Sequence, residues 1–166
     1  GYNTKATEAL YPVSAMLPPV SRFFLDPEQR EDDALLQRIA QADSSREHVG
    51  VMHANNASEQ RGGFSMYVPE CYDGETVPLI VCLHGGSGHG RSFLWTWLRT
   101  ARSRNCIVVS PTSQDRTWSL MGPDQDSSRL DAIVEYVKEH WAIDETRVLL
   151  TGMSDGGTFS YVTGLR

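Results

Sequence analysis

The segment Gly152–Gly156 is the part of the sequence whose residue types and spacing most directly indicate chemistry. It has the pattern G-x-S-x-G, with the apolar run Val148–Leu150 before it and a helix-compatible stretch after it. A sharp strand-to-helix turn leaves no room for side chains at its flanks, which explains the glycines at both ends. Such a turn presents the Ser154 hydroxyl beyond the end of the strand, so Ser154 is predicted to be a catalytic nucleophile.

A serine that attacks an acyl carbonyl creates a negatively charged oxygen, which preoriented N–H donors must hold. The N–H of Asp155, at the start of the expected helix, is one predicted donor. The second is expected from the glycine-rich segment His84–Gly90, which follows another apolar strand and lets the backbone approach closely. The prediction is the N–H of Gly86, with that of Ser87 in reserve.

Strand and helix patterns alternate through the second half of the chain. The expected elements, in order, are a strand at Val77–Leu83, a helix through Phe93–Ala101, a strand at Cys106–Val109, a helix over 127–141, a strand at Arg147–Leu150 and a final helix. This order predicts an α/β fold with a mostly parallel sheet and helices on both faces. Right-handed crossovers then bring both glycine-rich loops to the carboxyl edge of the sheet, where open α/β folds bind ligands.

The first part of the chain has a different pattern. Residues 1–24 show no clear period and hold three prolines, which predicts an irregular surface arm. Asp26 can cap a single helix over Pro27–Gln41. The segments Glu47–His53 and Gly63–Val68 predict an antiparallel hairpin at one edge of the sheet.

Taken together, three segments resemble the phospholipase/carboxylesterase branch of the α/β-hydrolases, and also esterases related to polyhydroxyalkanoate depolymerases. They are Leu83–Gly90, the Asp-containing loop before helix 127–141, and Thr151–Gly157, and the likeness extends roughly over Gly63–Arg166. The resemblance implies an α/β-hydrolase fold. It also implies hydrolysis of carboxylic esters or thioesters by a Ser–His–Asp triad, with no metal and no cofactor.

The triad expected from this resemblance is incomplete. In this fold the acid and the histidine follow the nucleophile, but no histidine follows Ser154, and Asp155 is too close to serve as the acid. His84 and His89 lie near the site by topology, and structural hydrogen bonding is the expected role of both. The chain is therefore expected to be truncated after the nucleophile turn, with a missing C-terminal part or a second polypeptide supplying the acid and the histidine.

The predicted edge of the sheet also indicates that part of the fold is missing. The strand at Arg147–Leu150 would be an unpaired edge, although its core is predicted to be buried on both sides. We divide the chain into an N-terminal arm and helix, residues 1–45, and the N-terminal part of an α/β-hydrolase domain, residues 46–166.

Other interpretations concern single residues and the class of protein. Asp124 and Asp126 have the residue type of metal ligands, but helix capping and loop polarity explain them better, so no metal site is predicted.

Trp118, in the loop after the strand Cys106–Val109, is predicted to contact the substrate. The alternative function is a non-catalytic binding or scaffold protein that kept the fold and lost its triad.

Composition narrows the partners and the compartment. The net charge is −6 over 166 residues with no long basic run, which argues against nucleic acid, and no apolar run reaches the length needed to cross a bilayer. The predicted partner is a small ester or thioester. Three cysteines occupy no metal-ligand spacing, and Cys82 and Cys106 are expected to be buried thiols. They favour a reducing, cytoplasmic location, while secretion after removal of a signal peptide stays open.

Overall fold

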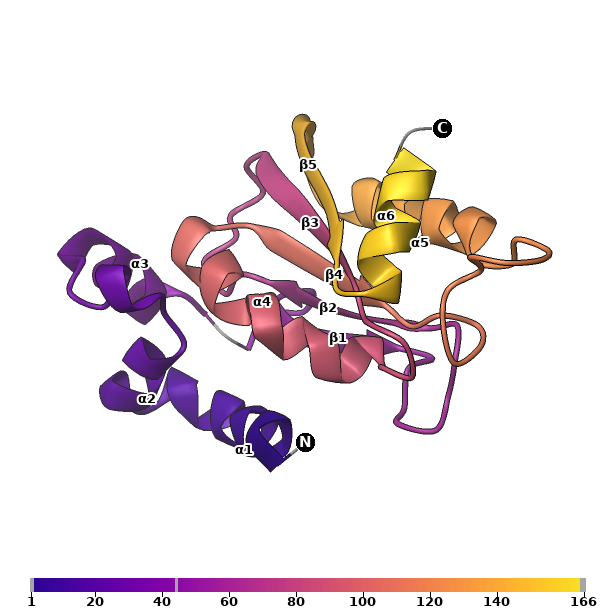
Figure 1. Cartoon of the computed structure of the whole chain (residues 1–166). Coiled ribbons are helices and arrows are strands. Elements are labelled where there is room, and N and C mark those ends of the chain that lie inside the picture. The colour runs from indigo at the N-terminus through magenta and orange to yellow at the C-terminus, as the bar shows by residue number, and fades with distance from the viewer. Residues whose placement is uncertain (1, 44, 165–166) are drawn as a thin grey trace.

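The computed structural model describes residues 2–43 and 45–164; Gly1, Ser44, Leu165 and Arg166, which fall within the two predicted domains, lie outside the described residues. The helices are α1 (Tyr2–Leu10), α2 (Pro18–Phe23), α3 (Asp33–Gln41), α4 (Gly90–Arg104), α5 (Ser127–His140) and α6 (Asp155–Gly164), with 3-10 turns at Tyr11–Ala15 and Pro27–Gln29. The strands are β1 (Gly50–Ala54), β2 (Phe64–Val68), β3 (Val77–Leu83), β4 (Ile107–Pro111) and β5 (Ile143–Gly152) (Figure 1).

The strands form one mixed sheet in the order β1-β2-β4-β3-β5. β1 and β2 form the predicted antiparallel hairpin at one edge, and β2 continues antiparallel onto β4. β3 lies between β4 and β5 and is parallel to both, with Leu79 opposite Ile107 and Leu83 opposite Gly152. The parallel part of the sheet therefore consists of the three strands whose apolar runs were evident in the sequence.

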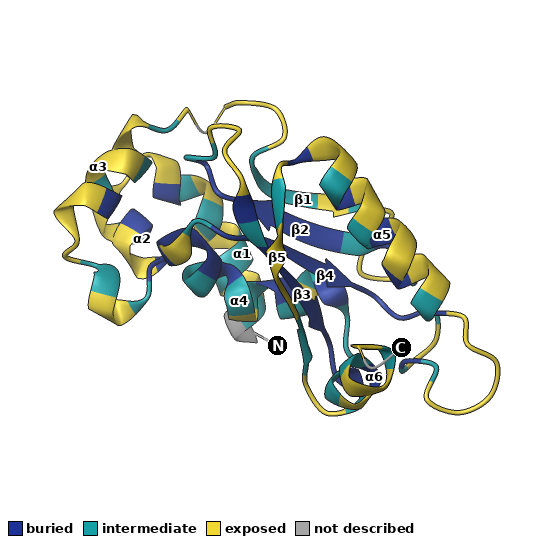
Figure 2. Ribbon diagram, turned by 90° about the horizontal axis from the view of Figure 1, so that it is seen from above, coloured by how far each residue is buried: buried dark blue, intermediate teal, exposed yellow. Residues whose placement is uncertain are grey.

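Alternate residues of β3 face two different helix layers, because successive side chains of a strand point to opposite faces. Leu79, Val81 and Leu83 belong to a core cluster with residues of α5 and α6, whereas Ile80 and Cys82 belong to a cluster with residues of α4. Both clusters are buried (Figure 2). The predicted arrangement, with helices on both faces of the sheet, is confirmed.

The connections reverse direction between β3 and β5. From β3 the chain passes through α4 to β4 on one side, and it then returns through α5 past β3 to β5. Right-handed crossovers in opposite directions place α4 and α5 on opposite faces. α6 packs with α5, so α4, which follows β3, and α6, which follows β5, lie on opposite faces of the sheet. Open α/β sheets bind ligands between two such neighbouring strands, at their carboxyl ends.

β5 ends the sheet within the described residues, as predicted. Val148 and Leu149 are 41% and 47% exposed, so the expectation of a strand buried on both sides is not met there. The reason is that β3 covers one edge of β5 and nothing among the described residues covers the other.

The expectation of an irregular arm over residues 1–24 is wrong. This segment is almost entirely helical, because its prolines stand in the first turns of helices, where a missing N–H costs nothing. Tyr11 and Phe24 pack edge to face at 5.5 Å, and Phe24 is fully buried against residues of α4. The segment is thus held against the α4 face of the sheet.

The single helix predicted over Pro27–Gln41 is also wrong in its limits. The chain forms a short 3-10 turn and then begins α3 at Asp33, with the side chain of Asp32 accepting the N–H of Leu35 at 3.0 Å. The carboxylate of Asp26 does not cap; it pairs with Arg104 of α4 instead. A tertiary ion pair therefore displaces the cap predicted from local sequence.

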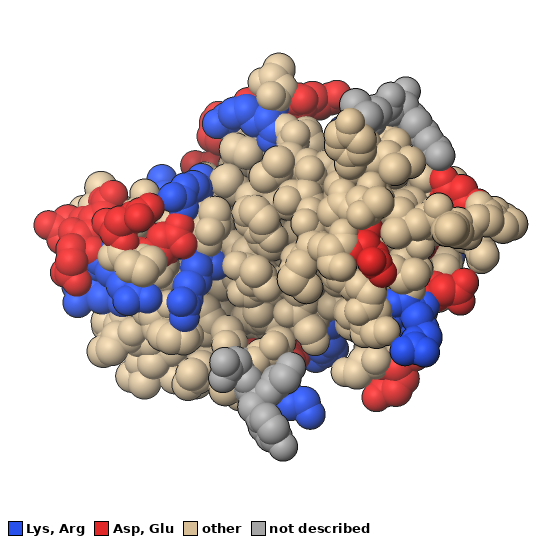
Figure 3. Space-filling view, in the orientation of Figure 1, with Lys and Arg blue, Asp and Glu red and all other residues tan. Residues whose placement is uncertain are grey.

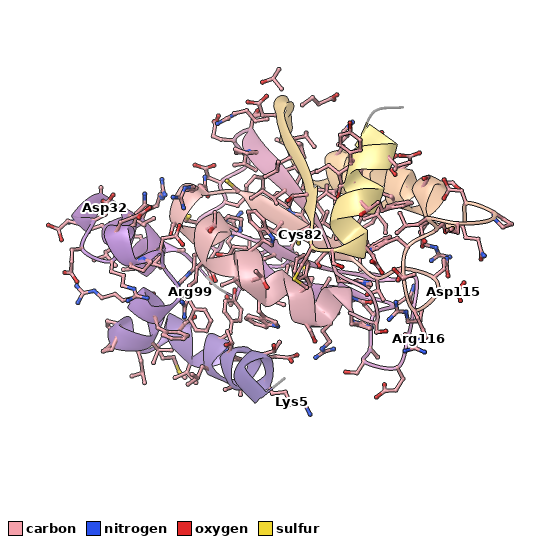
Figure 4. The ribbon with its side chains drawn as sticks, viewed as in Figure 1. Lys5, Asp32, Cys82, Arg99, Asp115 and Arg116 are labelled. Atoms are coloured by element: carbon pink, nitrogen blue, oxygen red, sulfur yellow. The ribbon has the colours of Figure 1, made fainter. Side chains whose placement is uncertain are left out.

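All three cysteines are free, and Cys82 and Cys106 are buried as predicted. Cys82 lies in the sheet beneath α4 (Figure 4). None of the helices within residues 2–43 and 45–164 combines the length and apolarity needed to cross a bilayer.

Candidate active site

Ser154 lies at the turn between β5 and α6, with its side chain exposed. Its backbone is left-handed, with φ of 52°, a conformation that costs a non-glycine residue on the order of 1 kcal/mol or more. The strain turns the serine away from both the strand and the helix. Ser154 thus lies at the carboxyl edge of the sheet, where the connections reverse between β3 and β5.

Two glycines make this turn possible. A Cβ atom on Gly152 would lie 2.4 Å from the carbonyl carbon of Gly156, and a Cβ on Gly156 would lie 2.4 Å from the carbonyl oxygens of Leu83 and His84. These are backbone contacts, which cannot move aside as a flexible side chain would. The first turn of α6 therefore packs directly on the end of β3.

The loop that follows β3 adjoins the serine. The N–H of Met153 donates to the carbonyl of Leu83 at 3.1 Å. A Cβ on Gly85 would lie 3.5 Å from the Cβ of Ser154. The two glycine-rich motifs, far apart in sequence, are therefore in contact at one edge of the sheet.

Two backbone N–H groups at this edge have no hydrogen-bond partner within the described residues: those of Gly86 and Asp155. The N–H of Ser87, in contrast, donates to the carbonyl of Arg116 at 2.6 Å, and Arg116 lies in the loop between β4 and α5 (Figure 4). The geometry favours Gly86 over Ser87 as the second donor. Asp155 is the first residue of α6, so the positive end of the helix dipole adds to its N–H.

The side chain of Asp155 fills the space above Gly86. Its Oδ2 accepts a hydrogen bond from the Thr117 hydroxyl at 2.6 Å and would lie 2.5 Å from a Cβ on Gly86, while its Oδ1 is 3.5 Å from the Ser154 hydroxyl. A carboxylate here opposes the formation of a nearby anion. The hydrogen bond from Thr117 offsets part of that effect by drawing the carboxylate toward the β4–α5 loop.

Trp118 lies beneath the site rather than on its surface. Its side chain is 3% exposed, its indole N–H donates to the carbonyl of His84 at 2.7 Å, and its ring stacks on Phe159 with centroids 5.3 Å apart. This burial counts against the predicted contact with substrate. The indole instead links the β4–α5 loop to the loop after β3 and to α6.

His84 is a buried structural residue. Its Nδ1 lies 2.7 Å from the carbonyl oxygen of Gly85 and must donate, while its Nε2 accepts the N–H of Ser113 at 3.1 Å. Burial, partly opposed by the hydrogen bond to Gly85, lowers the pKa of His84 to about 4. With both ring nitrogens engaged, His84 is not available as a base.

The other histidines are also engaged or distant. His89 accepts the N–H of Arg91 at the start of α4 with its Nδ1, and its Nε2 donates to the carbonyl of Gln60. His53 bonds Ser65 on β2. Among the described residues, no histidine is hydrogen-bonded to Ser154. The structural role expected for His84 and His89 matches the observed bonds.

Asp124 and Asp126 organise the β4–α5 loop. One oxygen of Asp126 accepts the N–H of Gln114 at 2.9 Å, and the other accepts the N–H and the hydroxyl of Ser119, both at 2.8 Å. Asp124 accepts the N–H of Ser127 at 3.0 Å, at the start of α5. No cluster of three or more His, Cys, Asp or Glu side chains suited to a metal occurs within the described part of the chain.

Sequence reasoning missed Arg61 and Thr117. The Arg61 guanidinium donates to the carbonyl of Gly88 at 2.8 Å and to the carbonyl of Ser113 at 3.1 Å, so it joins the glycine-rich loop to the β4–α5 loop. No local pattern identifies either residue, because each acts through a partner that is distant in sequence.

Comparisons with known proteins agree with this architecture. No protein-family model matches the chain. It is 33% identical over 106 residues to a probable feruloyl esterase C of Aspergillus terreus, a match that covers 59% of this chain and 39% of that protein. The matched region thus spans about two fifths of the length of this curated relative.

Solved structures give the fold. An acetyl xylan esterase from Aspergillus awamori superposes with a TM-score of 0.55 at 17% identity, covering 64% of this chain and 43% of the esterase. An esterase from Pyrobaculum calidifontis gives a TM-score of 0.52 at 20% identity over 96% of this chain and 51% of the esterase. The chain has the α/β-hydrolase fold, as predicted.

The close contact at Gly156 generates a test of the turn. We expect Gly156→Ala to lower the free energy of unfolding by about 1–3 kcal/mol, because the new methyl group would overlap the backbone of residues 83 and 84. Gly164→Ala is the matched control in the same helix, where a Cβ meets only ordinary contact at 3.8 Å, and we expect a change within about 1 kcal/mol. Urea unfolding followed by circular dichroism measures both. Equal effects of the two substitutions would contradict the packing described for the turn.

The environment of His84 predicts a pH dependence. Its pKa of about 4 in the folded protein lies below the ordinary 6.5, so the unfolded chain binds the proton more readily. The stabilisation from neutral His84 is therefore complete above pH 6.5 and is lost as the pH falls toward 4, a loss on the order of 3 kcal/mol. Unfolding measurements between pH 7.5 and 4 on wild type and His84→Gln, with NMR titration of the imidazole, check this. A His84 ring that titrates near 6.5 in the folded protein would show the assignment to be wrong.

Proposed function

We propose that the protein is a carboxylic ester hydrolase with Ser154 as its nucleophile. The observation that carries the proposal is the position of this exposed hydroxyl at a strained turn, beside two backbone N–H groups without partners, those of Gly86 and Asp155. A nucleophile next to preoriented donors is what acyl transfer requires. The α/β-hydrolase fold supports the same assignment.

The proposed reaction proceeds in two halves. The Ser154 oxygen attacks the acyl carbon while its proton passes to a histidine, and the carbonyl electron pair moves onto oxygen, where the N–H groups of Gly86 and Asp155 hold it. Collapse of this intermediate breaks the bond to the alcohol, which leaves with the proton from the histidine. Water then attacks the acyl-serine in the same way and releases the carboxylic acid.

We propose that the histidine and the acid come from outside these 166 residues, from further chain or from a second polypeptide. A serine without a base is a weak nucleophile at neutral pH. Within the described residues, His84 and His89 use both ring nitrogens for structural bonds. The base must therefore approach Ser154 from elsewhere.

The exposed edge of β5 supports the proposal that further chain or a second polypeptide supplies the histidine and the acid. Val148 and Leu149 are about half exposed, and Met153, Tyr161 and Val162 add exposed apolar surface on the adjoining turn and helix. A strand edge that has no neighbouring strand and carries exposed apolar side chains is a site where a further strand can add. A segment that pairs with β5 would lie next to the Ser154 turn and could carry the missing groups.

Oxygen esters are the proposed substrates in preference to thioesters. The curated relative at 33% identity is named for feruloyl ester hydrolysis, and we extend ester hydrolysis, not its particular acyl group, to this protein. We keep the cytoplasm as the proposed location on the basis of the three free cysteines.

The second candidate is a non-catalytic binding protein that kept the fold. It is favoured by one observation: the bonds of Ser154 within the described residues include none to a histidine. The two candidates differ in the reactivity of Ser154, which can be measured directly.

We expect the product of the complete coding sequence to react with a fluorophosphonate probe and to hydrolyse p-nitrophenyl acetate. Ser154→Ala should abolish labelling and lower kcat/KM about a thousandfold or more, since it removes the nucleophile. Ser92→Ala is the control, because Ser92 is also exposed and lies in the first turn of α4 but has no bond to the site. Labelling and kcat/KM of Ser92→Ala should match the wild type.

The 166 residues alone should show neither labelling nor hydrolysis above the level of Ser154→Ala. If the complete product also shows none, the binding-protein alternative is correct. If the 166 residues alone are active, the proposed external histidine is wrong.

A further inference from the structure

A second cavity lies away from Ser154, between the N-terminal helical segment and α4. Its volume is about 300 Å³, which is the lower end of the range for small-molecule sites. It is bounded by the turn after α1, by α2, by the inner side of α3 and by the C-terminal half of α4. We call it the arm cavity.

The arm cavity is distinct from the candidate active site. α4 begins at Gly90, next to the loop that adjoins Ser154, and Arg102 of the cavity lies twelve residues further along the helix. Twelve residues of α-helix span about 18 Å. The two sites therefore lie toward opposite ends of α4, and the N-terminal segment sits at the far end from α6 (Figure 1).

The floor of the cavity is a buried ion pair. Arg102 donates its Nε hydrogen to Glu70 Oε2 at 3.2 Å, and both side chains are less than 10% exposed. Tyr67 donates to the same oxygen at 2.8 Å, and Tyr11 donates to Glu70 Oε1 at 2.5 Å. Burial, and next the charge of Glu70, raise the pKa of both phenols, so they stay protonated as donors. The charge of Glu70 is thus fully compensated within the chain.

Donors remain unused on this floor. The other two bonds of Arg102 go to the backbone carbonyl and the hydroxyl of Ser21, which leaves two of its five N–H hydrogens without a partner among the described residues. Ser14 is only 6% exposed and lines the cavity, and its hydroxyl has no hydrogen bond among the described residues. The cavity therefore has two polar groups ready for a hydrogen-bond acceptor.

The charged side chains that line the cavity also favour an anionic ligand. Arg22 stands exposed at its mouth, and with Arg102 and Glu70 the lining side chains carry one net positive charge. Figure 3 shows side chains of both signs side by side at this end of the molecule, over α3. The Arg102 and Glu70 charges on the floor balance, so the net positive charge of the lining comes from Arg22 at the mouth, and it favours entry of an anion over entry of a cation.

The walls are apolar. Leu36, Ile39 and Ala40 of α3 line the cavity, and Met16 and Pro18 before and at the start of α2 line it as well. Leu36 and Ile39 are only partly buried, and Met16 is 73% exposed. A hydrocarbon body placed between these walls would cover apolar surface that is now in contact with water.

We propose that the arm cavity binds a small carboxylate with an apolar body, its carboxylate on the free hydrogens of Arg102 and on the Ser14 hydroxyl, and its body between α3 and the turn at Met16. Arg and a hydroxyl are suitable donors for a carboxylate. The site does not depend on the reactivity of Ser154.

The probe is octanoate, titrated by calorimetry into the purified protein, with octanol as the neutral analogue. We expect saturable 1:1 binding of octanoate and at least about tenfold weaker binding of octanol, which lacks the charge. Ser154→Ala should bind octanoate with unchanged affinity, so failure of the proposed hydrolase activity does not affect this result.

Two substitutions on α3 form a matched pair. Ala40 lines the cavity and Ala34 does not, while both are exposed in the same helix. Ala40→Trp should weaken octanoate binding at least about tenfold by filling the space, and Ala34→Trp should change it less than about twofold. Ser14→Ala, which removes the hydroxyl without adding volume, should weaken binding several-fold.

Circular dichroism and urea unfolding establish that each variant is folded. Absence of octanoate binding to wild type overturns the proposal. So does equal binding by Ala40→Trp and Ala34→Trp, or equal affinity for octanoate and octanol.

Discussion

The site depends on one close contact, the packing of the first turn of α6 directly on the end of β3. Because glycine stands at 152 and 156, backbone meets backbone at distances that no side chain would permit. This contact holds the turn in which Ser154 is left-handed and in which the N–H of Asp155 has no hydrogen-bond partner among the described residues. The strain at Ser154 is maintained because the parallel pairing of β3 with β5 holds both ends of the turn.

The loops around this turn are held by buried polar groups rather than by regular structure. His84 and Trp118 bond backbone atoms across two neighbouring loops, Asp126 bonds backbone atoms within the β4–α5 loop, and Arg61 joins two of the loops. In the proposed reaction these groups do not react; they hold the loops that carry the proposed N–H donors of Gly86 and Asp155, and donors fixed in advance are what stabilises an anion in a transition state. The Glu70–Arg102 pair has a comparable role at the other end of α4, where it joins the N-terminal segment to the sheet.

Strands and tight turns, which local residue patterns determine, could be predicted from the sequence. Side-chain contacts between segments far apart in the chain could not. The run Val77–Leu83 and the glycines around Ser154 identified the parallel strands and the turn, because burial on both faces and tight bends each constrain residue type. The N-terminal helices were missed because their prolines were interpreted as helix breakers, when they begin helices. Asp26 was assigned as a cap although it pairs with Arg104, and Trp118 was assigned to substrate although it is buried. Arg61 and Thr117 had no sequence signature, since their role exists only once the loops have met.

The proposed role of the Ser154 turn is tested most directly by a crystal structure of the complete protein after reaction with a fluorophosphonate. We expect phosphorus bonded to the Ser154 oxygen and the phosphonyl oxygen within about 2.7–3.1 Å of the N–H nitrogens of both Gly86 and Asp155. A phosphonyl oxygen directed away from these two groups, or phosphorus attached to a different residue, would contradict it.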